Sequence, residues 1–160
     1  MRRKDKEMTD VGEILDVVGR CMICRLAMVD GDVPYVVPMN FAHVHENGVL
    51  ELFFHGAMTG RKIDVLKANP NVCVEMDLDH GVIRADEPCD YGYAFESVVC
   101  AGKARFLEDV AEKTRALNVI MAKYSGGSDS FAFGDNALKA TAVYAVRADW
   151  FTGKRKLIAR

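Results

Sequence analysis

The alternation of hydrophobic and polar positions predicts a protein built mainly from β-strands. Apolar residues alternate with polar ones, or run continuously, over residues 21–29, 33–45, 49–55, 72–78, 93–106 and 140–151. Stretches of this length and pattern indicate strands. Asp30-Gly31 follows the first stretch and Asn47-Gly48 the second, and both dipeptides favour tight hairpin turns. The first three strands should therefore form a meander.

Helical spacing of apolar residues is found in three other segments, 9–19, 61–68 and 108–124. The last of these is the longest predicted helix. Residues 79–92 and 125–136 are polar and contain glycines, so we expect loops there. Six strands with one substantial helix favour an antiparallel barrel.

Composition limits the class of protein. The chain has 160 residues, half of them hydrophobic, which suits a single domain over residues 1–160 with its own core. The net charge of −2 does not favour nucleic acid or an anionic membrane surface as a partner. The charged N-terminus is not followed by an apolar run, and no stretch is long enough for a membrane helix. We therefore expect a cytoplasmic protein.

Two groups of candidate metal ligands have simpler explanations. Cys21 and Cys24 form a CxxC pair, but the pair lies in an apolar predicted strand and not at a helix start, so we interpret both thiols as core residues. His43 and His45 would share one face of a strand, which could begin a metal site. The nearby Asn47-Gly48 turn favours an exposed hairpin end instead, and we predict no metal site.

A loop between a strand and a helix is the clearest candidate for a binding site. Phe54-His55-Gly56 ends a predicted strand, and Arg61-Lys62 opens a predicted helix. A helix N-terminus offers free N–H groups to an anion, and the two cations would add charge-assisted hydrogen bonds, so this loop suits a phosphate. The Thr59 hydroxyl could also donate. An ordinary capped helix with solvated cations is the alternative.

The stretch 34–41 is the second candidate. Pro38 would interrupt the hydrogen bonding of a central strand, so this strand should lie at a sheet edge or a bulge. Its free backbone edge and the amide of Asn40 could contact the rim of a planar ring. The alternative is an irregular edge strand without a ligand.

Three segments carry a resemblance to a known family: PYVVPMNF at 34–41, LFFHGAMTGRKIDVLKANPNVCVEMD at 52–77 and ESVVCAGKARFLED at 96–109. In this order and spacing the chain resembles the FMN-binding split-barrel proteins related to pyridoxamine 5′-phosphate oxidase, and most of all their nitroimidazole-resistance branch. The resemblance implies a six-stranded antiparallel Greek-key split β-barrel. It also implies a homodimer that binds two FMN molecules at its interface.

The resemblance further implies a role for individual residues. Arg61 and Lys62 match the phosphate-binding pair. The other matching residues would contact the flavin from one subunit or the other; they are Pro38, Met39, Asn40, Phe54, His55, Gly56, Glu96, Ser97, Val98, Trp150 and Lys154. The basic tail at 153–157 has no His, so it lacks the paired Arg and His with which the oxidase binds substrate phosphate. Pyridoxamine phosphate oxidation is therefore not the expected reaction.

The leading hypothesis is a flavin-dependent oxidoreductase. FMN would accept a hydride and pass electrons to a small organic acceptor, such as a nitroimidazole, with the protein supplying orientation and electrostatics. His55 is the candidate proton donor, because the pKa of histidine lies near neutrality. The alternatives are a flavin-binding protein without turnover, a haem-binding barrel with an axial histidine, and a barrel that binds a deazaflavin.

Overall fold

The computed structural model describes residues 3–127 and 130–157 and contains one antiparallel sheet. Its strands are β1 (Glu7–Met8), β2 (Ile23–Asp30), β3 (Val33–Asn40), β4 (Ala42–Glu46), β5 (Val49–Ala57), β6 (Asn71–Ile83), β7 (Gly92–Phe106) and β8 (Thr141–Lys156). The helices are α1 (Val11–Arg20), α2 (Arg61–Ala68), α3 (Val110–Ser125) and α4 (Asp135–Ala140), with short 3₁₀ turns at Lys4–Lys6 and Pro88–Asp90.

The sheet curls into a barrel that does not close. Its strand order is β3-β2-β6-β7-β8-β5-β4, with β1 added beside β8. No strand among the described residues joins β3 to β4, the two ends of this order. The predicted split barrel is therefore confirmed. It has more strands than the six expected, because the chain adds β1 and because residues 33–45 form two strands.

Phe41 is where the predicted strand 33–45 divides, and α3 holds this break in place. The Phe41 N–H donates to the Tyr124 hydroxyl over 3.0 Å. That hydroxyl lies 2.6 Å from the Met22 carbonyl oxygen and donates to it. Lys123 lies over the Phe41 ring, 3.8 Å from its centroid, and donates to the Cys21 carbonyl oxygen over 2.6 Å. The end of α3 therefore fixes both the break and the start of β2.

The barrel interior is filled by alternating residues of the long strands. Phe54 and Tyr144 stack there, with ring centroids 5.3 Å apart. Two helices complete this core. From α1 it includes Ile14, Val17 and Val18, and from α2 Ile63, Val65 and Leu66. Helix α2 has the predicted bounds, because its apolar positions recur at helical spacing.

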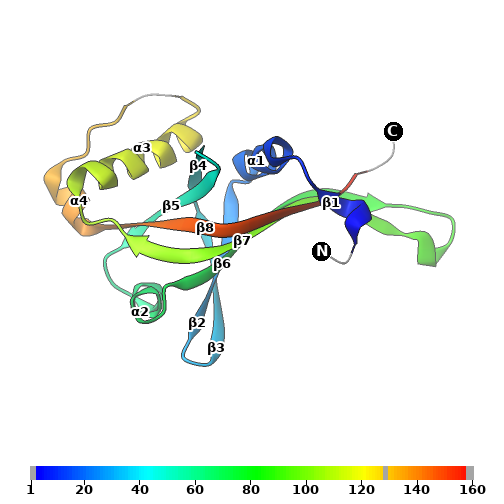
Figure 1. The fold of residues 1–160 in the computed structure, drawn as a ribbon, viewed down its shortest axis with the longest axis horizontal. Helices are drawn as coiled ribbons and strands as arrows, with labels where there is room; N and C mark the ends of the chain where they lie inside the picture. Colours follow the sequence, from blue (N-terminus) through cyan, green and yellow to red (C-terminus); the bar gives the residue numbers. More distant parts are fainter. Residues whose placement is uncertain (1–2, 128–129, 158–160) are drawn as a thin grey trace.

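A second apolar layer lies on the outer side of β4, β5 and β8. Helices α3 and α4 pack there through Leu117, Ile120 and Leu138, against Phe53 and Val143 of the sheet. Figure 1 shows these two helices together at one end of the molecule, next to β5 and β8. This layer lies across β5 from the barrel interior.

Several predicted boundaries were wrong. The predicted loop 79–92 is shorter than expected, because β6 continues to Ile83 with a register shift after Asp79, and β7 begins at Gly92. The predicted basic tail is the end of β8, which pairs with β7. Helix α4 begins inside the predicted loop 125–136, of which residues 128–129 lie outside the described residues. The glycines and charged residues at these positions interrupt the hydrophobic pattern that predicts a strand, because these strands are exposed on one face.

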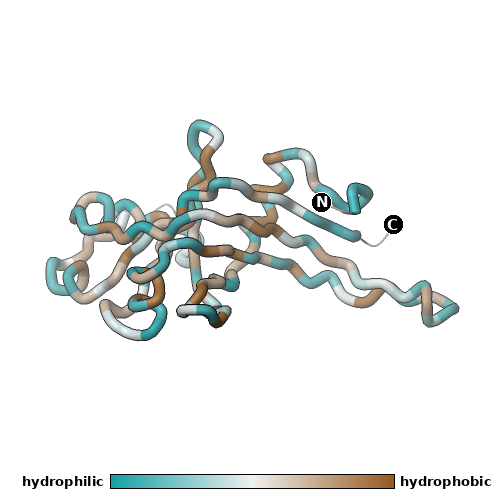
Figure 2. The backbone as a smooth tube through the Cα atoms, turned by 60° about the horizontal axis from the view of Figure 1, so that its bottom comes forward, coloured by the Kyte–Doolittle hydropathy of each residue, from teal (hydrophilic) through white to brown (hydrophobic). Residues whose placement is uncertain are grey.

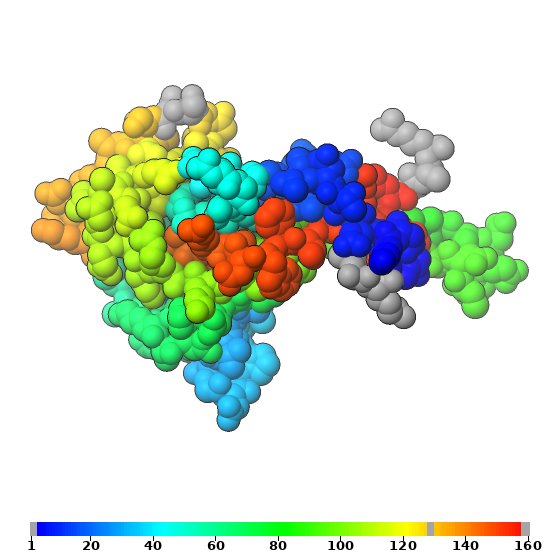
Figure 3. All heavy atoms as spheres, viewed as in Figure 1, coloured from blue at the N-terminus to red at the C-terminus, as the bar shows by residue number. Residues whose placement is uncertain are grey.

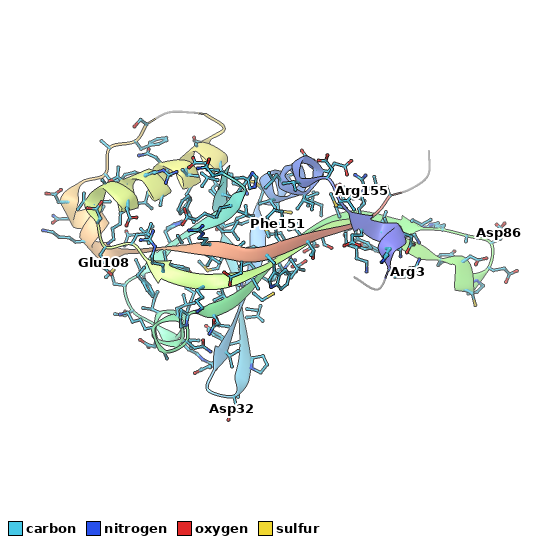
Figure 4. The ribbon with its side chains drawn as sticks, viewed as in Figure 1. Arg3, Asp32, Asp86, Glu108, Phe151 and Arg155 are labelled. Atoms are coloured by element: carbon cyan, nitrogen blue, oxygen red, sulfur yellow. The ribbon has the colours of Figure 1, made fainter. Side chains whose placement is uncertain are left out.

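The β6–β7 hairpin projects from the body as an arm, and Asp86 lies at its tip (Figures 1 and 4). The β2–β3 hairpin projects separately, with Asp32 at its tip (Figure 4). Both hairpins stand clear of the body in the space-filling view (Figure 3). The β6–β7 arm carries hydrophobic as well as hydrophilic residues (Figure 2), and Val82, Tyr91 and Tyr93 on it are exposed. Within the described residues, no helix has the length and apolar character needed to cross a membrane.

Gly102 lies at an irregularity in the pairing of β7 with β8. The register between β7 and β8 shifts there, with the extra residue on β8, because Ala101 lies opposite Trp150 and Gly102 opposite Ala148. A Cβ atom on Gly102 would overlap the carbonyl oxygen of Arg147. Backbone cannot move aside as a flexible side chain can, so this position requires glycine.

We expect Gly102→Ala to lower the free energy of unfolding by about 1–3 kcal/mol or more, because the added methyl group overpacks the β7–β8 pair. Urea denaturation followed by circular dichroism measures this. Gly19→Ala in α1 is the control, since its new methyl group would lie 3.8 Å from the nearest atom, His43 Cε1. Alanine favours a helix, so the control should be unchanged or more stable. Equal stabilities for the two variants would contradict the assignment.

Candidate functional site

The opening between β3 and β5 brings together the two candidate segments of the sequence. Strand β4 pairs with β5 only as far as Phe53, so residues 54–57 have β8 on one side and no strand of the described chain on the other. Of the strands that the structure describes, only β2 pairs with β3. Helix α2 begins beside this opening, and Lys62 connects its two sides. We call this region the split.

Lys62 is the central cation of the split. Its Nζ lies 2.9 Å from the Met39 Sδ of β3, and it is the nearest atom to the side-chain position of Gly56 on β5. Burial lowers the pKa of Lys62. No carboxylate of the described residues pairs with it. A half-buried cation without an anionic partner is suited to binding an anion.

Arg61, the other predicted phosphate ligand, already has partners. Its Nε donates to Asp30 Oδ2 over 2.8 Å, and its guanidinium carbon lies 4.3 Å from the Tyr35 ring centroid. The N-cap of α2 is Gly60, which has no side chain to accept from the first N–H groups. Thr59 is exposed in the same loop. The helix start therefore leaves donors free beside Lys62.

The residues of β3 alternate between the core and the surface. Met39 packs against the barrel core, whereas Pro38 and Asn40 are exposed on the outer side of the sheet. The Asn40 side-chain amide lies 3.5 Å from the Met22 carbonyl oxygen, at the limit of hydrogen bonding. The predicted contacts of β3 with a ligand therefore divide between two faces.

Strand β5 divides its predicted residues in the same way. Phe54 is fully buried in the barrel, so its side chain is a core residue. His55 is exposed and points to the side covered by α3 and α4, where it lines a pocket. Gly56 faces Lys62. The structure therefore places His55 and Lys62 on opposite faces of β5, and does not bring them together on one face.

The remaining predicted residues lie on β7 and β8, away from the split. Ser97 lies opposite Lys154, and Val98 is buried opposite Gly153. Three strand spacings, or about 14 Å, separate β7 from β3. One chain therefore does not bring the two groups of predicted residues together.

These groups share an uncovered surface, which we call the outer face. It comprises the outward-facing residues of β3, β2, β6, β7 and β8. Ile23, Val36 and Trp150 on this face are 52 %, 52 % and 50 % exposed. Arg25 at its centre forms ion pairs with Glu75 and Asp77. An exposed apolar surface around a compensated charge cluster is typical of a protein–protein interface.

Glu96 was predicted to meet a flavin, but it lies under α1 in a polar cluster that the sequence did not indicate. It is 7 % exposed, and its Oε2 lies 2.9 Å from both Arg20 Nη2 and His80 Nε2. Burial opposes its ionisation, but the hydrogen bonds from His80 and Arg20 outweigh burial and hold its pKa below the usual range. These residues are distant in sequence and form no motif.

The cysteines and histidines that were considered as metal ligands lie in environments that packing within the protein explains. Cys21 and Cys24 are buried in the core, as predicted, and burial raises their thiol pKa values to about 11 and about 12. His45 contacts the Phe151 ring edge-on at 6.3 Å between centroids. Burial lowers the pKa of His43. No cluster of three or more potential metal ligands occurs in the described part of the chain.

The sequence profile of the family described as pyridoxamine 5′-phosphate oxidase matches residues 10–155. A solved structure from Bacteroides thetaiotaomicron, provisionally described as a 5-nitroimidazole antibiotic resistance protein, is 35% identical. The similarity covers 93% of this chain and 86% of that one, with a TM-score of 0.78. Comparison with curated protein sequences gave no match.

Two more distant structures share the fold. An FAD- and haem-binding protein from Mycobacterium smegmatis is 19% identical over 97% of this chain and 76% of its own, with a TM-score of 0.85. A flavocytochrome from Azotobacter vinelandii is 19% identical over 99% of this chain and 72% of its own, with a TM-score of 0.84. At this identity the likeness extends to the fold alone.

We expect Glu96→Gln to lower the free energy of unfolding at neutral pH by about 1–3 kcal/mol, because hydrogen bonds to charged groups are lost. The folded-state pKa of Glu96 is below its usual value, so its ionised form stabilises the protein above that value. This contribution is lost as the pH falls through the folded-state pKa. The difference between wild type and variant should therefore shrink in acid.

Urea denaturation at a series of pH values measures this difference. Glu46→Gln is the matched control, because Glu46 is exposed and pairs with Arg115 at 3.3 Å on the surface. Surface pairs contribute only about 0–1 kcal/mol. A Glu96 variant that matches this control at every pH would show that the cluster does not stabilise the fold.

Proposed function

Because the chain belongs to the pyridoxamine 5′-phosphate oxidase family, we propose that it binds FMN at the split. The flavin would take a hydride from a reduced donor and pass the electrons to a small organic acceptor. The observation that carries the proposal is Lys62, a half-buried cation that lacks an anionic partner in the described residues and faces the free edges of β3 and β5. A phosphate would compensate this charge. A bound flavin would supply the redox chemistry.

The start of α2 suits the phosphate of FMN. Lys62 and the free backbone N–H groups after Gly60 converge there. Arg61 would join them by exchanging its exposed ion pair with Asp30 for the phosphate. Exposed ion pairs contribute only about 0–1 kcal/mol, so this exchange costs little. These donors converge on one place, which suits a single terminal phosphate such as that of FMN.

A second copy of the chain would complete the site. The split of one chain offers a phosphate site and a strand edge, whereas Ser97, Trp150 and Lys154 lie on the outer face. A homodimer formed through the outer face would cover Ile23, Val36 and Trp150. It would also bring β7 and β8 of one chain to the split of the other, as the family resemblance implies.

The acceptor is proposed to be a small organic molecule such as a nitroimidazole, in view of the Bacteroides relative. His55 is the proposed proton donor. It is exposed on β5, one residue before Gly56 at the split. The strand edge would hold the cofactor in position, and His55 would hold a proton next to it.

Lys62→Ala should weaken FMN binding about tenfold to hundredfold, because a charge-assisted hydrogen bond of roughly 1.5–3 kcal/mol is lost. Quenching of flavin fluorescence during titration measures the affinity. Riboflavin lacks the phosphate, so its affinity should be the same for wild type and variant. Lys67→Ala, in the last turn of the same helix, is the control and should bind FMN normally.

The absorption spectrum of the protein provides an independent check. Flavin bands are expected, and a Soret band would instead indicate haem. The phosphate site is misplaced if Lys62→Ala binds FMN as tightly as wild type does. It is also misplaced if the substitution lowers the affinity for riboflavin as much as the affinity for FMN.

Val36→Asp should convert the proposed dimer to a monomer, because it adds a charge to the apolar part of the outer face. Light scattering coupled to size-exclusion chromatography measures the mass. FMN affinity should fall in parallel, since the partner completes the site. Val110→Asp adds the same charge at a position that is 60% exposed on α3, and should leave the mass unchanged. A wild-type protein that is monomeric in the presence of FMN would contradict the dimer.

A further inference from the structure

A small apolar pocket lies between α3, α4 and the outer side of β5. Its volume is about 180 Å³, and it adjoins the second apolar layer of the fold. We call it the α3–α4 pocket. Its walls include Leu117, Ile120 and Met121 of α3, Phe133 and Leu138 from the segment that follows, and His55 of β5. It lies on the face of β5 opposite Lys62, so the proposed phosphate site does not account for it.

Two polar side chains of α3 hold the walls of this pocket in place. The Asn118 side chain accepts from the Phe131 N–H over 2.6 Å and donates to the Phe131 carbonyl oxygen over 3.2 Å. Lys113 is 8% exposed, and its Nζ donates to the carbonyl oxygens of Leu138 and Thr141 over 3.1 and 3.2 Å. The chain before and after α4 is therefore tied to α3, and the pocket is formed without a ligand.

The size and lining of the pocket limit what it can bind. An engineered apolar cavity of about 150 Å³ lined by Leu, Ile and Phe holds a benzene molecule. The α3–α4 pocket is slightly larger and has a similar lining, with Met121 as an adaptable wall. It therefore has room for one aromatic ring with small substituents, but not for the three fused rings of a flavin.

Among the described lining residues, His55 is the one with an ionisable side chain. The Thr141 hydroxyl, the other polar side chain in the lining, already donates to the Ala137 carbonyl oxygen over 2.8 Å. His55 has no hydrogen-bond partner within the described residues, so its imidazole is available to a ligand. A ligand that fills the apolar part and meets His55 needs one polar substituent or ring nitrogen at its edge.

The geometry points to the α3–α4 pocket as the binding site for a single-ring aromatic or heteroaromatic compound, whose polar edge accepts a hydrogen bond from His55. The assignment of this compound as the electron acceptor rests on the proposed function, whereas its binding does not. His55 would then contact the acceptor from one face of β5, while the edge of the same strand lines the split.

Binding of 2-methyl-5-nitroimidazole to the flavin-free protein, followed by ¹⁵N-resolved NMR titration, tests the inference. We expect saturable shifts confined to residues of α3, α4 and β5. Met121→Trp, which fills the pocket, should weaken binding at least about tenfold, since the ring loses its apolar contacts. Val110→Trp, at an exposed position of the same helix, is the matched control and should bind as wild type does.

Two further measurements distinguish the contribution of the apolar pocket walls to binding from that of the His55 hydrogen bond. His55→Leu should weaken nitroimidazole binding several-fold but leave toluene binding unchanged, because toluene accepts no hydrogen bond. If Met121→Trp does not fold, Ala137→Phe fills the pocket from α4 at an exposed position. Shifts that do not saturate, that lie outside these elements, or that persist in both filled variants would overturn the inference.

FMN titration of the same proteins separates this inference from the proposed function. Met121→Trp should retain wild-type FMN affinity, since it lies across β5 from Lys62. If the wild-type protein binds the nitroimidazole but takes up no FMN, the proposed function is wrong and the pocket assignment stands. If the protein binds FMN but not the nitroimidazole, only the pocket assignment is wrong.

Discussion

The hydrogen bonds of the Tyr124 hydroxyl with the backbone of Phe41 and Met22 are the constraint on which the candidate site depends. They fix the point where the chain leaves β3, at one end of the sheet, and enters β4, at the other. If residues 33–45 formed one continuous strand, β3 and β5 would not both present free edges beside α2. Because α3 provides this hydroxyl and also covers β5, the helix that opens the split also builds the α3–α4 pocket.

Local patterns in the sequence predicted what is decided locally. Both predicted hairpins form, with their two-residue loops at Gly31-Asp32, one residue beyond the predicted dipeptide, and at Asn47-Gly48. Helix α2 has its predicted bounds, because turn chemistry and helical spacing act over a few residues. The break at Phe41 depends on Tyr124, 83 residues away, and the Glu96 cluster joins residues 76 apart. Long-range contacts of this kind leave no short-range pattern. Strands over 72–78 and 93–106 were predicted, but the continuation of β6 to Ile83 was missed because this part lies on the projecting arm and shows no alternation imposed by a core.

Electrostatics distinguishes Lys62 from the other cations of the protein. Arg25, Arg61, Arg105, Arg115 and Arg155 all pair with carboxylates near the surface. The buried Lys113 is compensated by two carbonyl oxygens. Within the described part of the chain, Lys62 has only the Met39 thioether within hydrogen-bond distance, although burial makes its charge costly. Lys123, which is also partly buried, donates to the carbonyl oxygens of Val18 and Cys21. Since the other two buried cations of the described residues are held by carbonyl oxygens and Lys62 is not, a ligand anion is the expected partner of Lys62.

Strand β5 connects the two proposed sites through the alternation of its side chains. Phe54 and Gly56 face the barrel and Lys62, and His55 between them faces the α3–α4 pocket, while their shared backbone edge lies in the split. Stacking of Phe54 on Tyr144 anchors this segment in the core, so the edge and the imidazole are held in a fixed relation. A cofactor along the edge and a ring against His55 would then lie within the width of one strand. His55 and Lys62 lie on opposite faces of β5, so they cannot belong to one site on a single face. This placement suits a cofactor and an acceptor that bind to different faces of the same strand.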